Sequence, residues 1–393
     1  LFVIGAKRTA FGKFGGILKD KTATDLAEIA ARAALQEAAI KPENVDHVVF
    51  GNTIQSSRDA SYLARHVALR IGLPHSIPAV TINRLCGSGF QSIIDACLQI
   101  KCGDSKIVLT GGTESMSQAP FIVRNVRFGT TFGADYMFED SLWQGLTDEF
   151  IKMPMAITAE NLGVLYKLTR NDVDEFANRS QTRWRLANNA EYFKAEITPI
   201  IFKAKEGDFV FDVDEHPRET TIESLAKLKS IFKKDGLVTA GNASGICDGA
   251  SSVIVANEGS ISALHLTPLA RIVAWDVIGC DPSIMGIGPV YAIRNILKKT
   301  GLGLANIDLI EVPFSLCVFD PYFICRFSCE LGIENDQLNV NGGAIALGHP
   351  LAASGSRIIA HLCHELNRRN AKYAVGAACI GGGQGIAILL EHI

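Results

Sequence analysis

This chain of 393 residues has little net charge and no long apolar run. Lys and Arg number 38 against 41 Asp and Glu, a formal net charge of −3, so the chain as a whole does not attract nucleic acid or an anionic membrane surface. No run of about 18 apolar residues occurs, so the sequence predicts no transmembrane segment. An anionic ligand must therefore be held by a local basic patch.

The sequence also lacks the cysteine pattern of a small disulfide-stapled protein. Its 10 cysteines are spread along the whole chain, and we interpret most of them as small core residues in a reducing compartment. No group of His, Cys and Asp has the spacing of a metal site, so no metal is expected.

What the chain has is material for a large core. Hydrophobic residues make up 48% of it and charged residues 20%, which excludes general disorder. Short apolar runs alternate with helical patterns, which predicts an α/β fold with strands covered by helices on both faces. We expect a helix at 24–38 and strands at 47–51, 106–112, 252–256, 270–274, 308–312 and 373–377.

The two ends of the chain resemble each other, which indicates an internal duplication. The segment Gly89-Phe90-Gln91-Ser92-Ile93-Ile94 has a counterpart roughly 265 residues later, and each precedes a predicted helix and strand. We predict an N-terminal half over residues 1–262 and a C-terminal half over 267–393. A more polar stretch, about 113–242, is interpreted as a subdomain inserted into the first half.

Cys86 lies in the most distinctive local pattern, Asn83-Arg84-Leu85-Cys86-Gly87-Ser88-Gly89-Phe90. A strand-like run precedes it and an apolar-periodic helix follows, so Cys86 is expected on a strand-to-helix turn like that of a nucleophile elbow. The helix N-terminus is expected to lower the pKa of the thiol. The alternative is a buried core cysteine; the flanking pattern favours a nucleophile.

Two further loops carry chemistry-bearing residues. Three consecutive glycines follow Cys379 and Ile380, and their N–H groups suit an oxyanion, although a purely structural loop has the same pattern. The order of glycines does not fit a dinucleotide-binding turn. His349 lies between Gly348 and Pro350, a fixed backbone that suits an imidazole aimed at one reacting atom.

These three loops, with segments 111–117 and 241–245, resemble the thiolase family over nearly the whole chain, and within it the mitochondrial 3-ketoacyl-CoA thiolases. Ketoacyl synthases share the fold but lack the second cysteine loop. The resemblance implies a duplicated, five-layered αβαβα thiolase fold with a loop subdomain that covers coenzyme A. It also implies a homodimer or homotetramer.

The resemblance implies roles for individual residues. Cys86 would be the nucleophile that takes the acyl group, and His349 would activate its thiol. Cys379 would be the acid and base at the α-carbon of acetyl-CoA. The N–H groups of Cys86 and Gly381 would form an oxyanion hole. Such chemistry needs a soft nucleophile, a proton relay and donors for two oxyanions.

For coenzyme A, which is a substrate here and not a bound cofactor, the family pattern points to Arg218, Thr220 and Ser244. Four lysines follow Arg218, and this basic excess suits nucleotide phosphates, although a solvated helix face is the alternative interpretation. They are Lys227, Lys229, Lys233 and Lys234.

The sequence departs from the family pattern after Val312. Thiolases continue this strand with Asn-Glu-Ala-Phe, whose Asn holds a water in an oxyanion hole, whereas residues 313–330 resemble no thiolase segment. One interpretation is a divergent segment; the other, which we favour, is an error in the recorded sequence, because the match resumes at Asn339. A smaller departure is Ala352, where the family usually has Gly, and its methyl group is expected to shift His349 slightly.

The function expected is 3-ketoacyl-CoA thiolysis through an acyl-cysteine, in fatty-acid β-oxidation. The alternatives are a catalytically impaired homologue that binds acyl-CoA and an acyl-CoA hydrolase. Four basic residues precede the first acidic residue, Asp20, which favours the mitochondrial matrix. Acyl chain length is left open, because it depends on the shape of the loops over the pocket.

Overall fold

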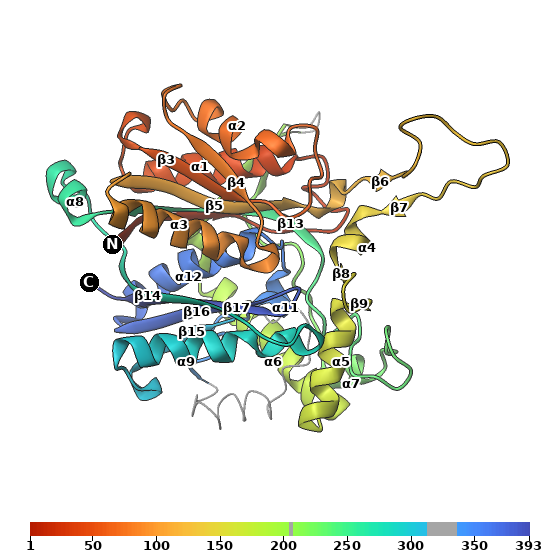
Figure 1. The fold of residues 1–393 in the computed structure, drawn as a ribbon. Helices are drawn as coiled ribbons and strands as arrows, with labels where there is room; N and C mark the ends of the chain where they lie inside the picture. The colour runs from red at the N-terminus through yellow and green to blue at the C-terminus, as the bar shows by residue number, and fades with distance from the viewer. Residues whose placement is uncertain (204–206, 313–335) are drawn as a thin grey trace.

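The computed structural model describes residues 1–203, 207–312 and 336–393 (Figure 1). The segment 313–330, which departs from the family pattern, lies outside the described residues. Its two flanks are joined by paired hydrogen bonds, because the Val312 N–H donates to Asn339 Oδ1 over 3.0 Å and Asn339 Nδ2 donates to the Val312 carbonyl over 3.1 Å.

The N-terminal half is built on a mixed sheet. Strand β3 lies parallel to β4 and β5, whereas β13 lies antiparallel to β5 and β1. The order across the sheet is β4-β3-β5-β13-β1. Its strands are β1 (Phe2–Thr9), β3 (His47–Gly51), β4 (Ala79–Ile82), β5 (Ile107–Ser115) and β13 (Cys247–Ala256).

The C-terminal half repeats this sheet. Strand β15 lies parallel to β16, and β17 lies antiparallel to β16 and β14, in the order β15-β16-β17-β14. A short antiparallel pairing of β14 with the start of β1, Val3 opposite Ala270, joins the strands of the two halves into one continuous order. A parallel bridge between Ile310 and Leu338 takes the place that β4 has beside β3. The strands are β14 (Ala270–Gly279), β15 (Leu309–Glu311), β16 (Tyr373–Ile380) and β17 (Gln384–Glu391). The predicted duplication is therefore visible in strand order and direction.

Helices separate and cover the two sheets, giving five layers (Figure 1). Helices α1 and α2 cover the outer face of the first sheet, α3 and α12 lie between the sheets, and α9 covers the outer face of the second. The predicted α/β fold with five-layered αβαβα architecture is confirmed. These helices are α1 (Ala23–Glu37), α2 (Leu63–Arg70), α3 (Ser88–Cys102), α9 (Gly288–Thr300) and α12 (Ala353–Arg369).

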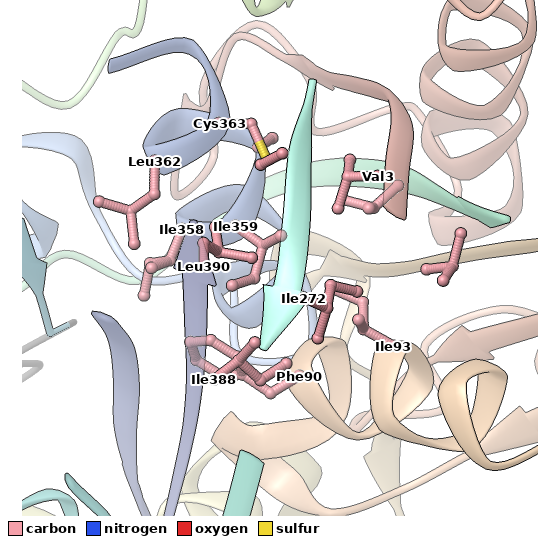
Figure 2. Packing of buried hydrophobic residues seen from close by; sticks show 14 of the residues in the cluster. Val3, Phe90, Ile93, Ile272, Ile358, Ile359, Leu362, Cys363, Ile388 and Leu390 are labelled. Atoms are coloured by element: carbon pink, nitrogen blue, oxygen red, sulfur yellow. The ribbon is translucent and has the colours of Figure 1, made fainter. Parts of the chain in front are cut away.

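Glycines let the two central helices touch backbone to backbone. A methyl group at Gly89 of α3 would lie 2.5 Å from the Ser356 nitrogen of α12, and one at Gly355 would lie 2.3 Å from the Phe90 nitrogen. Any larger residue at either position would force the helices apart. Around this contact the two halves share one apolar core, shown in Figure 2, which includes Val3, Phe90, Ile93, Ile272, Ile358, Ile359, Leu362, Ile388 and Leu390.

The polar region between β5 and β13 forms the inserted loop subdomain. Two long helices, α5 (Met155–Tyr166) and α6 (Arg170–Asn189), lie beside the C-terminal half, and a long hairpin through β6 (Phe121–Ile122) and β7 (Glu139–Asp140) projects from the body (Figure 1). Shorter elements are α4 (Ser141–Gly145), α7 (Ile222–Ala226), β8 (Thr147–Asp148), β9 (Met153–Pro154), β10 (Ile197–Thr198), β11 (Ile200–Phe202) and β12 (Phe209–Phe211). Outside the subdomain lie β2 (Gly12–Lys13), α8 (Glu258–Leu264) and α11 (Ala344–Leu347).

A buried ionic network ties this subdomain to both halves. Arg8 on β1 is fully buried and pairs with Glu196 and Asp214, each at 2.6 Å. Glu196 also pairs with His361 on α12, over 2.6 Å. Because each buried charge has a partner of opposite sign, the network fixes how the segments that carry Glu196 and Asp214 lie against the central layer.

Candidate active site

Cys86 lies in a tight turn, η3 (Leu85–Gly87), between the end of β4 and the start of α3. Leu85 has φ +48°, a left-handed conformation that is uncommon for a residue with a side chain. Ser88 stabilises the turn, since its Oγ accepts from the Arg84 N–H and donates to the Leu85 carbonyl. The predicted strand-to-helix turn is confirmed, with the backbone strain that a nucleophile elbow often has.

The protonation of Cys86 differs from the sequence-based expectation. Burial raises the pKa of the Cys86 thiol to about 11, although the N–H groups of Gly381 and Cys86 itself act in the opposite direction. The sequence predicts that the helix N-terminus lowers this pKa; the Cys86 N–H does act in that direction, but the loss of water on burial outweighs it. A base is needed to remove the proton.

His349 offers an imidazole nitrogen that can act as a base. Its imidazole is buried, and its Nδ1 lies 2.6 Å from Ser354 Oγ in the first turn of α12. The Ser354 hydroxyl has the Pro350 carbonyl as an acceptor at 3.1 Å, and with its proton there its oxygen accepts from an Nδ1–H group of His349. The lone pair of a neutral imidazole is then on Nε2, which has no hydrogen-bond partner among the described residues.

The surroundings of His349 keep the ring neutral. Burial, followed by the charge of Arg357, lowers its pKa to about 3. The backbone N–H of His349 donates to the Gly245 carbonyl over 3.0 Å, which fixes the backbone of the loop. Ala352 has φ −71°, an ordinary right-handed value, so its methyl group brings no backbone strain to the loop.

Cys379 and Gly381 come from the end of β16 and the turn that follows. Burial, and then the nearby Cys86, raise the pKa of the Cys379 thiol well above its usual range, which favours its protonated form. The N–H of Gly381 faces the Cys86 sulfur. Gly383 has φ +80°, and a methyl group on it would lie 2.3 Å from the Cys280 carbonyl, so this turn requires glycine.

The structure thus brings Cys86, Cys379 and Gly381 together from opposite halves of the chain. Turn η3 contacts both β16 and α12, and the His349 loop leads directly into α12. A thiol, a free imidazole nitrogen and backbone N–H donors can together support nucleophilic attack, proton transfer and oxyanion stabilisation.

The residues predicted for coenzyme A lie on the loop subdomain. Arg218 and Thr220 line a cavity of about 170 Å³ beside Gln181, Trp184 and Arg185 of α6. Arg218 is exposed, and its guanidinium donates to the Ala240 carbonyl over 2.8 Å. The four lysines predicted to form a basic patch are all exposed, which fits both interpretations of them.

Ser244 does not line this cavity and lies next to the His349 loop instead. It directly precedes Gly245, whose carbonyl accepts the His349 N–H. A methyl group on Gly245 would lie 1.8 Å from His216 Nε2, so the segment leading to Arg218 packs against the Ser244 loop. A ligand that follows these residues would extend from the 218–220 segment toward His349.

Two polar residues beside these loops were not identified from the sequence as parts of a site. Ser354 orients His349 through the contact of its Oγ with Nδ1. In the sequence, its place five residues after His349, at the start of a predicted helix, is the feature that could have indicated this role. Glu114 is fully buried and bonded to the His349 loop, since it accepts the Ala352 N–H over 3.1 Å. Glu114 lies in segment 111–117, which is part of the family pattern, but the spacing of residues in the sequence does not reveal its contact with Ala352.

Comparison with known proteins identifies the family. The model of the thiolase N-terminal domain matches residues 1–259, and that of the thiolase C-terminal domain matches residues 266–392. The chain therefore belongs to the thiolase family, whose members are acyltransferases.

Individual relatives agree with this assignment over their full length. The chain is 58% identical to the mitochondrial 3-ketoacyl-CoA thiolase of Bos taurus, with 100% of this chain and 98% of the bovine protein covered. It is 43% identical to an acetyl-CoA acetyltransferase of Syntrophomonas wolfei, with the same coverage. The crystal structure of human mitochondrial 3-ketoacyl-CoA thiolase in complex with CoA superposes with a TM-score of 0.95 at 57% identity, covering 100% of this chain and 98% of that one.

Proposed function

We propose that this chain is a 3-ketoacyl-CoA thiolase, which cleaves a 3-ketoacyl-CoA with CoA to give acetyl-CoA and a shortened acyl-CoA. The observation that carries the proposal is the meeting of Cys86, from the N-terminal half, with Cys379 and the Gly381 N–H, from the C-terminal half. The relatives named 3-ketoacyl-CoA thiolase support it over the full length of the chain.

The first half-reaction transfers the acyl group to Cys86. His349 Nε2 takes the thiol proton, and the sulfur attacks the C3 carbonyl carbon of the substrate. N–H donors, including those of Cys86 and Gly381, stabilise the negative charge on oxygen. The C2–C3 bond then breaks, the acyl group stays on Cys86 as a thioester, and Cys379 gives its proton to the acetyl-CoA enolate.

The second half-reaction restores the resting site. The CoA thiol gives its proton to the Cys379 thiolate, and its sulfur attacks the acyl-cysteine carbonyl. The same donors stabilise this second oxyanion. Cys86 leaves and recovers its proton from His349, so that both cysteines and the imidazole return to their starting states.

Coenzyme A is in this proposal a substrate, and no resident cofactor takes part. Arg218, Thr220 and Ser244 are proposed to bind it, because the first two line the cavity on the loop subdomain and the third lies beside the His349 loop. An exposed guanidinium at a cavity rim suits a phosphate group.

We also propose a homo-oligomer in the mitochondrial matrix, acting in fatty-acid β-oxidation. The mitochondrial names of relatives support the compartment. The projecting hairpin supports self-association, because Phe128 and Phe132 on it are fully exposed and large exposed apolar surfaces are typical of interfaces. A sedimentation measurement distinguishes monomer, dimer and tetramer.

The test of the proposed activity is cleavage of acetoacetyl-CoA and of a medium-chain 3-ketoacyl-CoA, each with and without CoA, beside Cys86→Ala. CoA-dependent cleavage that Cys86→Ala abolishes is expected. Cys102→Ser is the matched control, because this cysteine is exposed at the far end of α3.

Two other outcomes would contradict the proposal. Labelling of Cys86 without turnover would indicate the catalytically impaired homologue, and release of free acid without CoA would indicate the hydrolase. No relative reported above carries a name that favours either alternative.

A further inference from the structure

Glu114 is a fully buried carboxylate near the end of β5 that accepts hydrogen bonds from several N–H donors. Its oxygens accept from Asn52 Nδ2 at 3.1 Å, from the Thr53 and Ile54 N–H groups at 3.2 and 2.9 Å, and from the Ala352 N–H at 3.1 Å. Among the described residues no Lys, Arg or His forms an ion pair with it. Burial raises the pKa of Glu114 to about 7, although these N–H donors act in the opposite direction. The carboxylate is therefore ionised over the higher pH range in which the Cys86 thiol loses its proton.

This carboxylate bridges the two halves of the fold. Thr53 and Ile54 follow β3 in the N-terminal half, whereas Ala352 lies three residues after His349 in the C-terminal half. The backbone of β5 also packs directly against Ala352, since a methyl group on Gly112 would lie 1.8 Å from the Ala352 carbonyl oxygen. Strand β5 therefore holds the His349 loop through a side chain and through its main chain.

Cys86 packs beside both ends of the bridge. It contacts an apolar cluster that includes Ile54 and Leu351. Ile54 donates its N–H to Glu114, and Leu351 directly precedes Ala352, which does the same. The groups that face the Cys86 thiol are Glu114 from β5, Cys379 from β16 and the N–H donors of Gly381 and Cys86. The negative charge of Glu114 adds to burial in raising the pKa of this thiol.

We propose that Glu114 is a positioning residue with two effects: its carboxylate fixes the His349 loop against the segment after β3 that packs beside Cys86, and its negative charge, where ionised, disfavours a thiolate at Cys86. The first effect rests on the proposed thiolase function and the second does not. A neutral thiol resists stray electrophiles until a bound substrate and His349 draw its proton away.

The experiment compares Glu114→Gln and Glu114→Asp in the full chain. Alkylation of Cys86 by iodoacetamide is followed against pH, with Cys86→Ala as the blank, and kcat is measured with acetoacetyl-CoA. Glu114→Gln removes the charge, so the alkylation midpoint is expected to fall by about one pH unit. Glu114→Asp keeps the charge but shortens the bridge, so it should keep the midpoint and lower kcat by about tenfold to 10²-fold.

Glu160→Gln is the matched control. Glu160 is also a buried carboxylate that accepts backbone N–H groups, from Leu237 and Val238, but it does not act on Cys86. Its replacement should leave the alkylation midpoint of Cys86 unchanged. A structural defect shared by all buried glutamates would move both midpoints alike.

An unchanged midpoint in Glu114→Gln would overturn the electrostatic effect, and a wild-type kcat in Glu114→Asp would overturn the bridge. If Glu114→Gln does not fold, as judged by circular dichroism, Glu114→Asp alone decides: a wild-type kcat rejects the proposal and a loss of kcat with an unchanged midpoint supports it. If the wild-type chain shows no thiolysis, the proposed function fails, while the alkylation measurement still decides the effect on the thiol.

Discussion

The starts of the two central helices are equivalent places in a duplicated fold, yet they carry different chemistry. Before α3 the chain makes a short turn with Cys86, strained at Leu85. Before α12 it makes a longer loop with His349, whose backbone requires left-handed conformations at Gly342, Gly343 and Gly348. The proposed nucleophile and its base thus occupy related positions in the two halves.

This difference shows how a duplication can build one site from two copies. The helices cross at Gly89 and Gly355, so their N-terminal ends are brought together by backbone contact. Each half is then free to diverge at its own helix start, while the crossing keeps the distance between the two starts fixed. The loop after β16 adds Cys379 and Gly381 from a third position.

The largest expected loss of activity distinguishes the roles of Cys86 and Cys379. Cys379→Ser should lower thiolysis by about 10³-fold, because general acid catalysis at the enolate is weakened. It should impair exchange of the acetyl group between acetyl-CoA and labelled CoA much less, because this exchange forms no enolate and uses Cys379 only for the proton of the CoA thiol. Cys86→Ala should lose both reactions.

The exchange assay is the decisive measurement for this pair. Equal losses of exchange and of thiolysis in Cys379→Ser would contradict the proposal that Cys379 acts chiefly at the enolate. Cys102→Ser again serves as the control for cysteine replacement away from the site.

A smaller loss of activity is expected for Ser354→Ala on the C-terminal side. Without Ser354 Oγ, the proton on His349 Nδ1 has no acceptor, so the tautomer with a free Nε2 is no longer favoured. We expect kcat to fall by about 10- to 10²-fold with little change in KM, given that a wrong tautomer costs up to about 10⁴ elsewhere.

Ser356→Ala tests whether any serine in α12 has this effect. Ser356 Oγ donates to the Ser251 carbonyl and has no bond to His349, so its loss should affect stability rather than kcat. Equal losses of kcat in the two variants would contradict a specific role for Ser354.

The helix crossing itself is tested by Gly89→Ala. The added methyl group would overlap the Ser356 nitrogen at 2.5 Å, and relief requires the helices to move apart. A loss of about 3 kcal/mol in the free energy of unfolding is expected, measured by urea denaturation. Gly259→Ala in α8 is the control, because its methyl group would meet only Asn257 Oδ1 at 3.7 Å, an ordinary contact, and a helix favours alanine.

The last prediction concerns pH and the buried network. Burial lowers the pKa of His361, but the charges of Glu196 and Glu311 outweigh it and raise the pKa to about 9. A raised pKa means that the stabilisation is fully present below the unfolded pKa of 6.5 and is lost as pH rises through about 9. The wild-type chain should lose up to about 3 kcal/mol of unfolding free energy across this range.

His361→Gln isolates this contribution. The variant should show a flatter pH dependence of unfolding between pH 6.5 and 9, measured by denaturant titration at each pH. Curves of the same slope for both proteins would contradict the assignment of the charge to His361.

Much of this architecture could be predicted from the sequence. Strand β3 lies at the expected residues, and α1 begins and ends one residue before the expected bounds. The sequence indicated the duplication, the turn at Cys86 and the thiolase family. It could do so because apolar patterns and glycine positions determine the backbone conformation of the few residues around them. The roles assigned to Cys86, His349, Cys379 and Gly381 stay predictions until the variants are measured.

Only the tertiary structure decided the charge states and the contacts between halves. The sequence predicted a low pKa for Cys86 from the adjacent helix N-terminus, whereas burial by segments distant in the chain reverses the direction. Likewise the bonds from Ser354 to His349 and from Glu114 to Ala352 depend on where loops meet. Hydrophobic pattern and turn chemistry are local properties, so the sequence alone determined the elements and the family; desolvation and hydrogen bonding across the two halves exist only once the chain has folded.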